Sequence, residues 1–147
     1  MKKKITVLTL CATLFALCLP AEAQQPTKIP RVGYLAANSL SDISARIEAF
    51  RQGLRELGYV EGKNIVLEWR SSEGKFDRLP ALAAELVRLK VDMIVTPGAP
   101  ATRAAKAATI TIPIIMSQDP DPVATGVVAS LARPGGNITG LAPLRQS

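Results

Sequence analysis

Histidine is absent from this 147-residue sequence, and its only cysteines are Cys11 and Cys18. Histidine is the usual general base at neutral pH, and cysteine thiolates are the soft ligands of zinc and iron–sulfur sites. Both cysteines lie in a segment that we expect to be removed, so the mature chain would lack both residue types. The sequence therefore predicts no catalytic residue, no metal site and no cofactor, and we expect a protein that is not an enzyme.

Nucleotide-binding motifs are absent as well. No G-x-G-x-x-G follows the first apolar run, and no G-x-x-x-x-G-K-[ST] occurs anywhere in the sequence. The chain carries 18 basic and 12 acidic residues, but the basic residues of 46–55 and 78–90 are mixed with Glu and Asp. A nucleic-acid binder needs a concentrated basic face with aromatic platforms. We therefore interpret the charge as a solvated surface and predict no nucleic-acid partner.

The first 23 residues have the three parts of a secretory signal peptide. Residues 2–4 are three lysines, residues 5–19 are apolar or small, and residues 21–23 fit an A-x-A cleavage site. The apolar run is shorter than the ~20 residues of a membrane span, which disfavours the alternative of an uncleaved anchor. Leu17 precedes Cys18, where lipid attachment would require a small residue. We predict cleavage after residue 23 and a periplasmic protein, whose remaining 15 basic and 11 acidic residues give a net charge of +4.

After a short linker (residues 24–30), strand-like and helix-like patterns alternate along the chain. Short apolar runs predict strands, and apolar residues three or four positions apart predict amphipathic helices. The expected strands are 31–36, 64–69, 91–96, 112–116 and 137–141. The expected helices are 43–57, 76–89, 100–108 and 123–131. This alternation predicts an α/β fold with a doubly wound parallel five-stranded sheet in the order 2-1-3-4-5.

Local signals refine these helices. Ser41 or Asp42 is expected to cap the first helix, and Gly58 to follow its end. Asp77 is expected to cap the second helix, whose first turn tolerates Pro80. The residues expected in the core are Val32, Tyr34, Ile65, Leu67, Met93, Val95, Ile114 and Ile138.

Ligands in such sheets bind at the carboxyl ends of the strands, near the point where the strand order reverses. That rule selects the loops 37–39, 71–73, 97–102 and 117–119. In the third loop, Gly98 and Ala99 leave the backbone accessible, and the helix start near Thr102 suits an anion such as a carboxylate. The alternative is that this loop is only a tight strand-to-helix turn.

Three polar residues at other strand ends are further candidates. Asn38 and Ser39 offer short donors and acceptors, or else they only close a local turn. The carboxylate of Asp119 could meet a ligand amine, although Asp119 and Asp121 could equally cap a helix, which is the better interpretation for Asp121.

Several segments resemble a known family. They are RVGYL (residues 31–35), FRQGLRELGY (50–59), EGKN (61–64), DPDPV (119–123) and SLARPGGNITG (130–140). In this order they are similar to the substrate-binding proteins of ABC transporters, of the kind that includes tryptophan/tyrosine-type uptake components. The match extends from about Arg31 to Leu141.

The resemblance implies a type I periplasmic-binding fold, in which two α/β lobes close on a small solute and deliver it to a permease in the inner membrane. Residues 31–141 would form the N-terminal lobe, and residues 142–147 would begin the crossover to a second lobe that this chain lacks. The family's lobe-one positions would correspond to Asn38, Ser39, Gly98, Ala99, Thr102 and Asp119.

The function expected from the sequence is thus a truncated, monomeric solute-binding component of an ABC uptake transporter, for a small polar and amino-acid-like solute. One alternative is a ligand-sensing module, which would have the same fold and deliver a ligand signal to a membrane kinase or receptor. The other is a flavodoxin-like enzyme, which would need a cofactor or a nucleophile–base pair that the sequence does not display.

Overall fold

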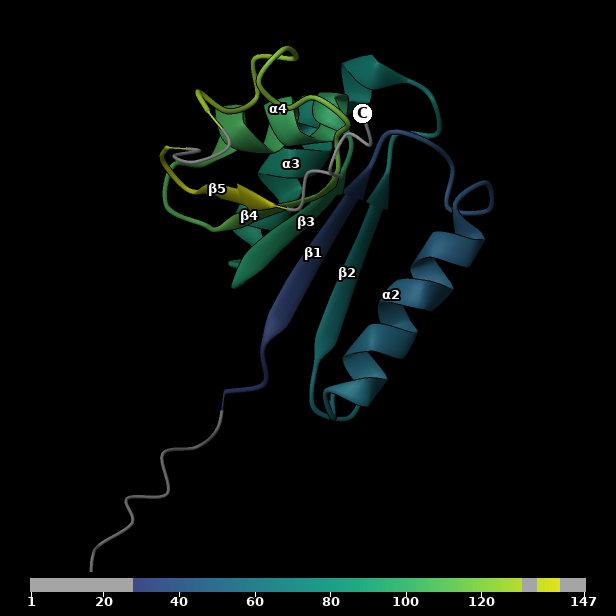
Figure 1. Ribbon diagram of the computed structural model, residues 1–147. Helices are drawn as coiled ribbons and strands as arrows, with labels where there is room; N and C mark the ends of the chain where they lie inside the picture. Colours follow the sequence, from purple (N-terminus) through teal and green to yellow (C-terminus); the bar gives the residue numbers. More distant parts are fainter. Residues whose placement is uncertain (1–27, 131–134, 141–147) are drawn as a thin grey trace, which may run out of the picture.

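A computed structural model describes residues 28–130 and 135–140 of the chain. The expected leader (residues 1–23) and the expected crossover (residues 142–147) lie outside the described residues. Within them, five strands form one sheet, in the order β2-β1-β3-β4-β5, and every neighbouring pair is parallel (Figure 1). The strands are β1 (Arg31–Ala36), β2 (Val66–Ser71), β3 (Met93–Pro97), β4 (Ile114–Gln118) and β5 (Ile138–Gly140). This topology confirms the predicted fold class.

Helices cover the sheet on both faces, as a parallel sheet requires. They are α2 (Ser44–Glu56), the short 3-10 helix η1 (Phe76–Arg78), α3 (Leu79–Arg88) and α4 (Ala99–Ala108). Figure 1 shows α2 on one face of the sheet, and α3 and α4 together on the other. The chain therefore folds into three layers, and within the sheet β1 lies between β2 and β3.

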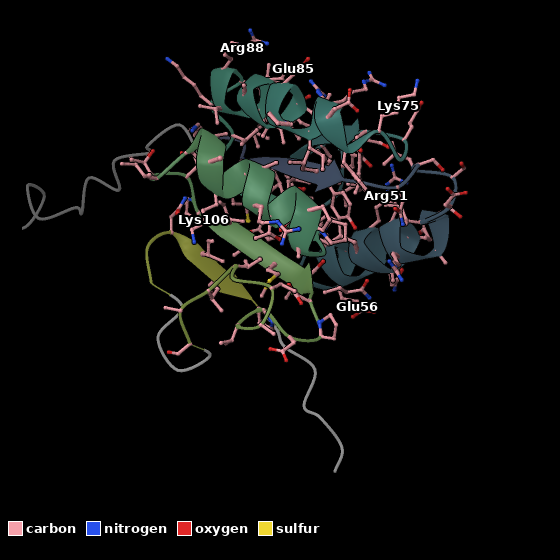
Figure 2. The ribbon with its side chains drawn as sticks, turned by 90° about the horizontal axis from the view of Figure 1, so that it is seen from above. Arg51, Glu56, Lys75, Glu85, Arg88 and Lys106 are labelled. Carbon is pink, nitrogen blue, oxygen red and sulfur yellow. The ribbon has the colours of Figure 1, made fainter. Side chains whose placement is uncertain are left out.

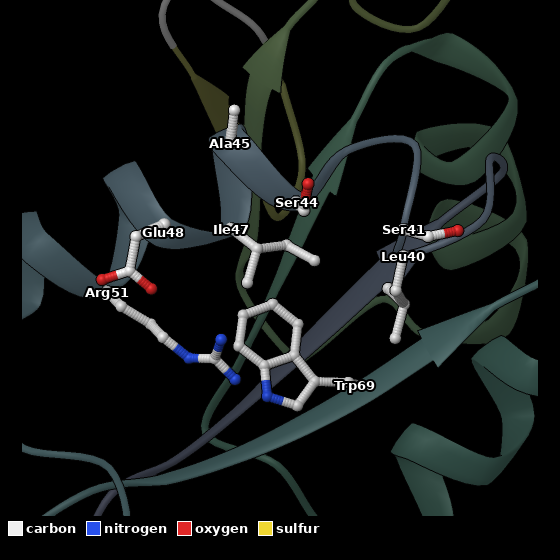
Figure 3. Close-up of a pocket in the computed structure, with 8 residues that line it drawn as sticks. All are labelled: Leu40, Ser41, Ser44, Ala45, Ile47, Glu48, Arg51 and Trp69. Carbon is white, nitrogen blue, oxygen red and sulfur yellow. The ribbon is translucent and has the colours of Figure 1, made fainter.

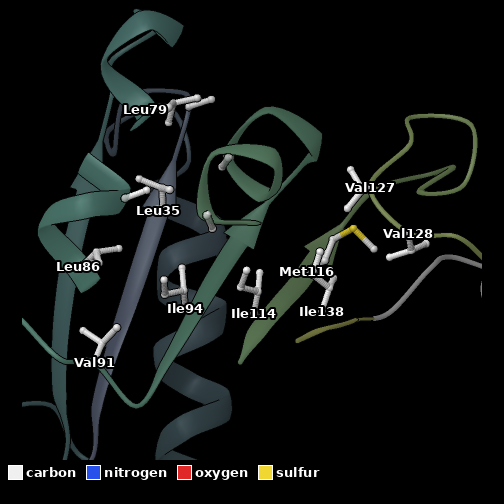
Figure 4. Packing of buried hydrophobic residues seen from close by; sticks show 14 residues of the cluster. Leu35, Leu79, Leu86, Val91, Ile94, Ile114, Met116, Val127, Val128 and Ile138 are labelled. Carbon is white, nitrogen blue, oxygen red and sulfur yellow. The ribbon is translucent and has the colours of Figure 1, made fainter. Parts of the chain in front are cut away.

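Each face of the sheet has its own hydrophobic core, because successive strand residues point to opposite faces. Val32 and Tyr34 of β1 pack with Ile47 of α2 on one face. Leu35 of β1 belongs to the larger core under α3 and α4, where Leu86 is fully buried (Figure 4). Seven of the eight expected core residues are buried, which confirms the strand faces inferred from the sequence.

The exception is Met93, which is 37% exposed. It starts β3 on the same face as Val95, and the residues of α2 that pack on this face reach Val95 but not Met93. The prediction that Met93 lies in a strand is confirmed, and the prediction that it is buried is wrong, because no helix covers this end of β3.

The strands β2, β3 and β4 begin two residues later than expected and end one or two residues later. Val91 illustrates the reason, because it is buried but precedes β3, and its N–H points back to the carbonyl of Leu86 at 3.5 Å. At the other end, the polar residues Ser71 and Gln118 continue the backbone ladders. An apolar run therefore marks burial, whereas the strand itself is set by backbone pairing.

The expected end of α2 is confirmed, and its expected start is wrong. Gly58 has a φ of +86°, and the N–H of Tyr59 reaches back to the carbonyl of Leu54 at 2.8 Å, as in a glycine-terminated helix. At the start, Ile43 takes the N-cap position and no side chain caps the helix, because residues 41–43 form a turn of their own. Leu57 is exposed, since it lies at the C-cap, beyond the last turn that packs on the sheet.

The second expected helix is divided in two. Residues Phe76–Arg78 form η1, so that Asp77 lies inside this short turn and Arg78 takes the N-cap position of α3 without a side-chain cap. Pro80 lies in the first turn of α3, as expected. Because η1 has a different twist from an α-helix, Phe76 leaves the apolar face and is 58% exposed.

The expected helix at 123–131 is wrong over its described residues. Residues 122–126 form turns instead, and Leu131 lies outside the described residues. The N–H of Thr125 bonds the carbonyl of Asp121 at 3.0 Å, but Gly126 has a φ of +72°, and this left-handed conformation ends the single turn. Within residues 28–130 and 135–140, three α-helices and η1 therefore accompany the five strands.

All three α-helices carry charged side chains. Figure 2 shows Arg51 and Glu56 on α2, Glu85 and Arg88 on α3, and Lys106 on α4. Acidic and basic groups alternate over this surface, in keeping with the solvated surface expected from the sequence. None of the helices described here has the length and apolar character needed to cross a membrane.

Candidate ligand-binding site

The carboxyl ends of β1 and β2 are joined by a network of hydrogen bonds. The fully buried Ser72 donates its hydroxyl to the carbonyl of Ala37 at 2.8 Å, and Ser71 donates its hydroxyl to the carbonyl of Asn38 at 2.7 Å. The N–H of Gly74 bonds the carbonyl of Ala37 at 2.7 Å. The loop after β2 thus fixes the backbone of the loop after β1, and the side chain of Asn38 is left exposed at this edge.

Ser39 closes a local turn, the alternative considered for it from the sequence. Its hydroxyl oxygen accepts a hydrogen bond from the N–H of Asp42 at 3.2 Å and lies 2.9 Å from the hydroxyl of Ser41. This arrangement leads the chain from β1 into α2, and Ser39 is partly exposed.

The loop between β3 and α4 is built on Gly98 and Thr102. Gly98 has a φ of +95°, a conformation that L side chains rarely adopt. Thr102 is fully buried, and its hydroxyl donates to the carbonyl of Gly98 at 2.9 Å and lies 2.7 Å from the hydroxyl of Thr96. The side chain of Thr102 therefore holds the turn together, and Gly98 and the first helical residue, Ala99, present the backbone of the loop.

Asp119 is also buried, with 1% of its surface exposed. Its two carboxylate oxygens accept hydrogen bonds from the N–H of Asp121 at 3.0 Å and the hydroxyl of Thr125 at 2.8 Å. The carboxylate of Asp121 accepts from the N–H of Ala124 at 3.0 Å, so it caps a turn where a helix was expected. The carboxylate of Asp119 therefore stabilises the loop after β4 through hydrogen bonds to other residues of that loop.

A pocket of about 130 Å³ lies where the strand order reverses, between the ends of β1 and β3. Of the six residues selected from the sequence, only Asn38 lines it, while Pro97 and Pro100 flank Gly98 and Ala99 along its wall. The complete lining is Ala36, Ala37, Asn38, Ile43, Arg46, Phe76, Pro97 and Pro100. The walls are mainly apolar with few polar groups, which is typical of a small-molecule site.

Two lining residues, Arg46 and Phe76, were not among the sequence candidates. In the sequence, Arg46 looks like one of several surface charges of an expected helix. Phe76 looks like part of the apolar face of another expected helix. The pattern that could have identified Phe76 is the Gly74-Lys75 pair before it, which favours a break rather than a helix start.

A larger hollow of about 690 Å³ lies between α2 and β2 (Figure 3). There Arg51 stacks over the ring of Trp69 at 4.9 Å, and Glu61 accepts hydrogen bonds from the indole N–H at 2.9 Å and from Arg51 at 2.8 Å. Burial would raise the pKa of Glu61, but these two hydrogen bonds outweigh it and lower the pKa. The charged groups Glu48 and Arg51 of this hollow are already paired with Arg55 and Glu61, and the hollow lies beside the edge strand β2 rather than at the reversal of strand order, so the smaller pocket is the better candidate.

Tyr34 forms an aromatic cluster with Phe50 and Trp69 on the face of the sheet covered by α2. Its ring lies 5.6 Å from that of Phe50 and 5.0 Å from that of Trp69. Burial raises the pKa of its phenol, and the charge of Arg46 opposes that shift.

Among the described residues, no group of three or more His, Cys, Asp and Glu could hold a metal ion.

Residues 36–146 match the family described as ABC transporter substrate binding protein. The chain belongs to this family. A curated member of similar sequence is a tyrosine-binding protein of Clostridioides difficile, which is 37% identical over 93 residues, covering 63% of this chain and 27% of that protein. The match confirms the resemblance inferred from the sequence segments.

Solved structures of substrate-binding proteins share this fold. The ligand-free, open form of a substrate-binding protein with adhesive properties from Clostridium difficile has a TM-score of 0.72 and 27% identity, over 78% of this chain and 39% of that one. A domain from Streptococcus pneumonia in complex with L-Trp has a TM-score of 0.71 and 28% identity, over 77% and 38%. The chain thus spans less than half of each of these relatives.

Proposed function

We propose that residues 31–141 form the first ligand-binding lobe of an exported receptor for an ABC uptake transporter, and that its solute is an aromatic amino acid. The pocket at the reversal of strand order carries this proposal, because ligands of such sheets bind there. Family membership supports the role in uptake. The related proteins named for tyrosine and solved with L-Trp support the class of solute.

The predicted site residues take two kinds of role in this proposal. Asn38 and Ser39 at the end of β1, with the backbone of Gly98 and Ala99, face the solute. Thr102 and Asp119 act through the loops that they hold, because their polar atoms bond within those loops. The proposed function is binding without chemical change to the solute.

The rest of the receptor follows from the expected two-lobed architecture. The lobe described here would supply one wall of the cleft, and a second α/β lobe would supply the other and close over the solute. Closure shifts a population of open and closed forms, since the solute binds the closed form better. The closed receptor would then dock on a permease of the inner membrane.

A nuclear magnetic resonance titration of the protein with L-tryptophan tests the binding proposal, because chemical shifts detect the weak affinity expected of half a cleft. The backbone amides of residues 37–39, 98, 99 and 101 should shift with added L-tryptophan, and those of residues 103–108 of α4 should not. Amide shifts that stay unchanged at saturating L-tryptophan would contradict the proposal.

Export is tested separately, by expressing the full sequence in a bacterium and sequencing the amino terminus of the periplasmic product. We expect it to begin at Gln24, after the A-x-A site. A matched variant with leucine at positions 21 and 23 should accumulate uncleaved. A full-length product in the cytoplasm would contradict the proposed leader.

A further inference from the structure

The pocket at the strand-order reversal combines one exposed aromatic ring with one exposed cation. Phe76 comes from η1 and Arg46 from the first turn of α2, and both line the same pocket of about 130 Å³. They come from segments far apart in the sequence, because α2 follows β1 and η1 follows β2. Neither residue is among the site residues predicted from the sequence.

Phe76 provides the apolar contact surface. Phe76 is 58% exposed, although it lines the pocket together with the buried Ile43 and with Pro97 and Pro100. A large apolar ring left open at a pocket loses contact with water when a ligand covers it, which favours an apolar ligand. A flat aromatic ring suits it best, since aromatic pairs gain stacking beyond the area that they bury.

The guanidinium of Arg46 differs in its surroundings from those of Arg51, Arg55 and Arg70. Arg51, Arg55 and Arg70 each lie within 4.0 Å of a glutamate oxygen, whereas the guanidinium of Arg46 makes no hydrogen bond or ion pair within residues 28–130 and 135–140. The other lining residues of the pocket carry no charge. A guanidinium at the rim of an otherwise uncharged pocket favours a ligand with an anionic group, and it can bond a carboxylate through two N–H groups.

We propose that Phe76 and Arg46 determine the specificity of this pocket: Phe76 stacks on the aromatic ring of the solute, and Arg46 pairs with its carboxylate. The inference rests on the proposed function and narrows it to solutes that carry both groups. Ala36 and Ala37 line the pocket at the end of β1, and their small side chains leave room for such a ring.

The test compares three probes on the protein and its variants, by chemical-shift titration. L-Tryptophan has the ring and the carboxylate, L-leucine lacks the aromatic ring, and tryptamine lacks the carboxylate. Phe76→Ala should weaken L-tryptophan binding about three- to tenfold, the range for loss of an aromatic pair, and change L-leucine binding by less than about twofold. Phe76→Leu keeps an apolar side chain but has no aromatic ring, so it should leave L-leucine binding unchanged and still fail to restore L-tryptophan binding.

Arg46→Gln should weaken L-tryptophan binding about two- to fivefold, the range for an exposed ion pair, and leave tryptamine binding unchanged. The loss should also shrink at high salt, because salt screens exposed charges. Arg88→Gln, an equal change of charge on the outer face of α3, is the matched control and should change none of the three affinities (Figure 2).

The outcomes separate the two proposals. If the unaltered protein binds L-tryptophan but Phe76→Ala keeps the same preference over L-leucine, the role of Phe76 is refuted and the proposed function stands. If Arg46→Gln weakens tryptamine and L-tryptophan equally, the carboxylate contact is refuted. If the unaltered protein binds none of the probes, the proposed function fails and the inference fails with it.

Discussion

Replacing Gly33 with alanine should destabilise the protein, because the added methyl group meets Leu86 across the interface of β1 and α3. A Cβ at position 33 would lie 2.9 Å from Cδ1 and 3.0 Å from Cδ2 of Leu86. Carbon atoms pack favourably at about 3.5–4.0 Å, so the two side chains would overlap by about 0.5 Å or more. Leu86 is fully buried, and its neighbours in the core limit how far it can move away.

The expected magnitude is the balance of two effects. Overpacking a core costs about 1–3 kcal/mol. Alanine in place of a strand glycine restricts the unfolded chain and returns roughly 0.5–1 kcal/mol, since Gly33 has no positive φ that alanine would strain. We therefore expect Gly33→Ala to lower the free energy of unfolding by about 1–2 kcal/mol.

A second substitution isolates the contact. Leu86→Ala alone should cost about 2–5 kcal/mol, as for other buried leucines. In the double variant, the methyl group at position 33 enters the space that Leu86 vacates. The two costs should then fail to add, and we expect a favourable coupling of about 1–2 kcal/mol.

Urea unfolding followed by the fluorescence of Trp69, the single tryptophan of the chain, measures these free energies. Gly53→Ala is the matched control, because nothing lies within 4 Å of a Cβ at this position of α2. It should stabilise the protein by about 0.5–1 kcal/mol. A Gly33→Ala variant as stable as the unaltered protein, or strictly additive costs in the double variant, would refute the reasoning.

Three further predictions concern the loops and the start of the sheet. Thr102→Val removes the hydroxyl that bonds the carbonyl of Gly98, and urea unfolding should show a loss of about 1–3 kcal/mol, whereas Thr102→Ser should retain most of the stability. Asp119→Ala leaves two donors of its loop without an acceptor, and the same assay should show a loss of about 1–3 kcal/mol. The hydrogen bond from Lys28 lowers the pKa of Asp92 below 3.8, so this carboxylate contributes stability above that pH and loses it as the pH falls through the folded pKa. Asp92→Asn should therefore be less stable than the unaltered protein at pH 7, and equally stable at a pH below the folded pKa; a difference that is constant with pH would contradict this.

The order of the sheet was predictable because it depends on features that a sequence displays directly. Apolar runs of five or six residues, separated by amphipathic stretches, leave a parallel α/β sheet as the simple solution. Gly58 and Pro80 mark the end and start of helices through backbone preferences that hold in any surroundings. Both positions are confirmed by the structure.

The pocket was less predictable, because it depends on contacts between distant residues. The sequence places Asp119 at a strand end, but it does not show that Thr125 folds back to bond the carboxylate. Thr102 was selected for its place at a helix start, and its burial follows from packing against β3. Phe76 reaches the pocket only because a 3-10 turn replaces the first turn of the expected helix.

The position of β1 between β2 and β3 bears on how the chain acquires its structure. Its Arg31 pairs with Val66, and its Val32 pairs with Met93, so its two partner strands follow 35 and 61 residues later in the chain. A chain that is synthesised or threaded from its amino terminus must leave β1 without a partner until those segments arrive. Sheets closed by such distant pairings form slowly. This delay leaves the apolar segment of β1 exposed in the unfolded chain, where a chaperone can bind it before its partner strands pair.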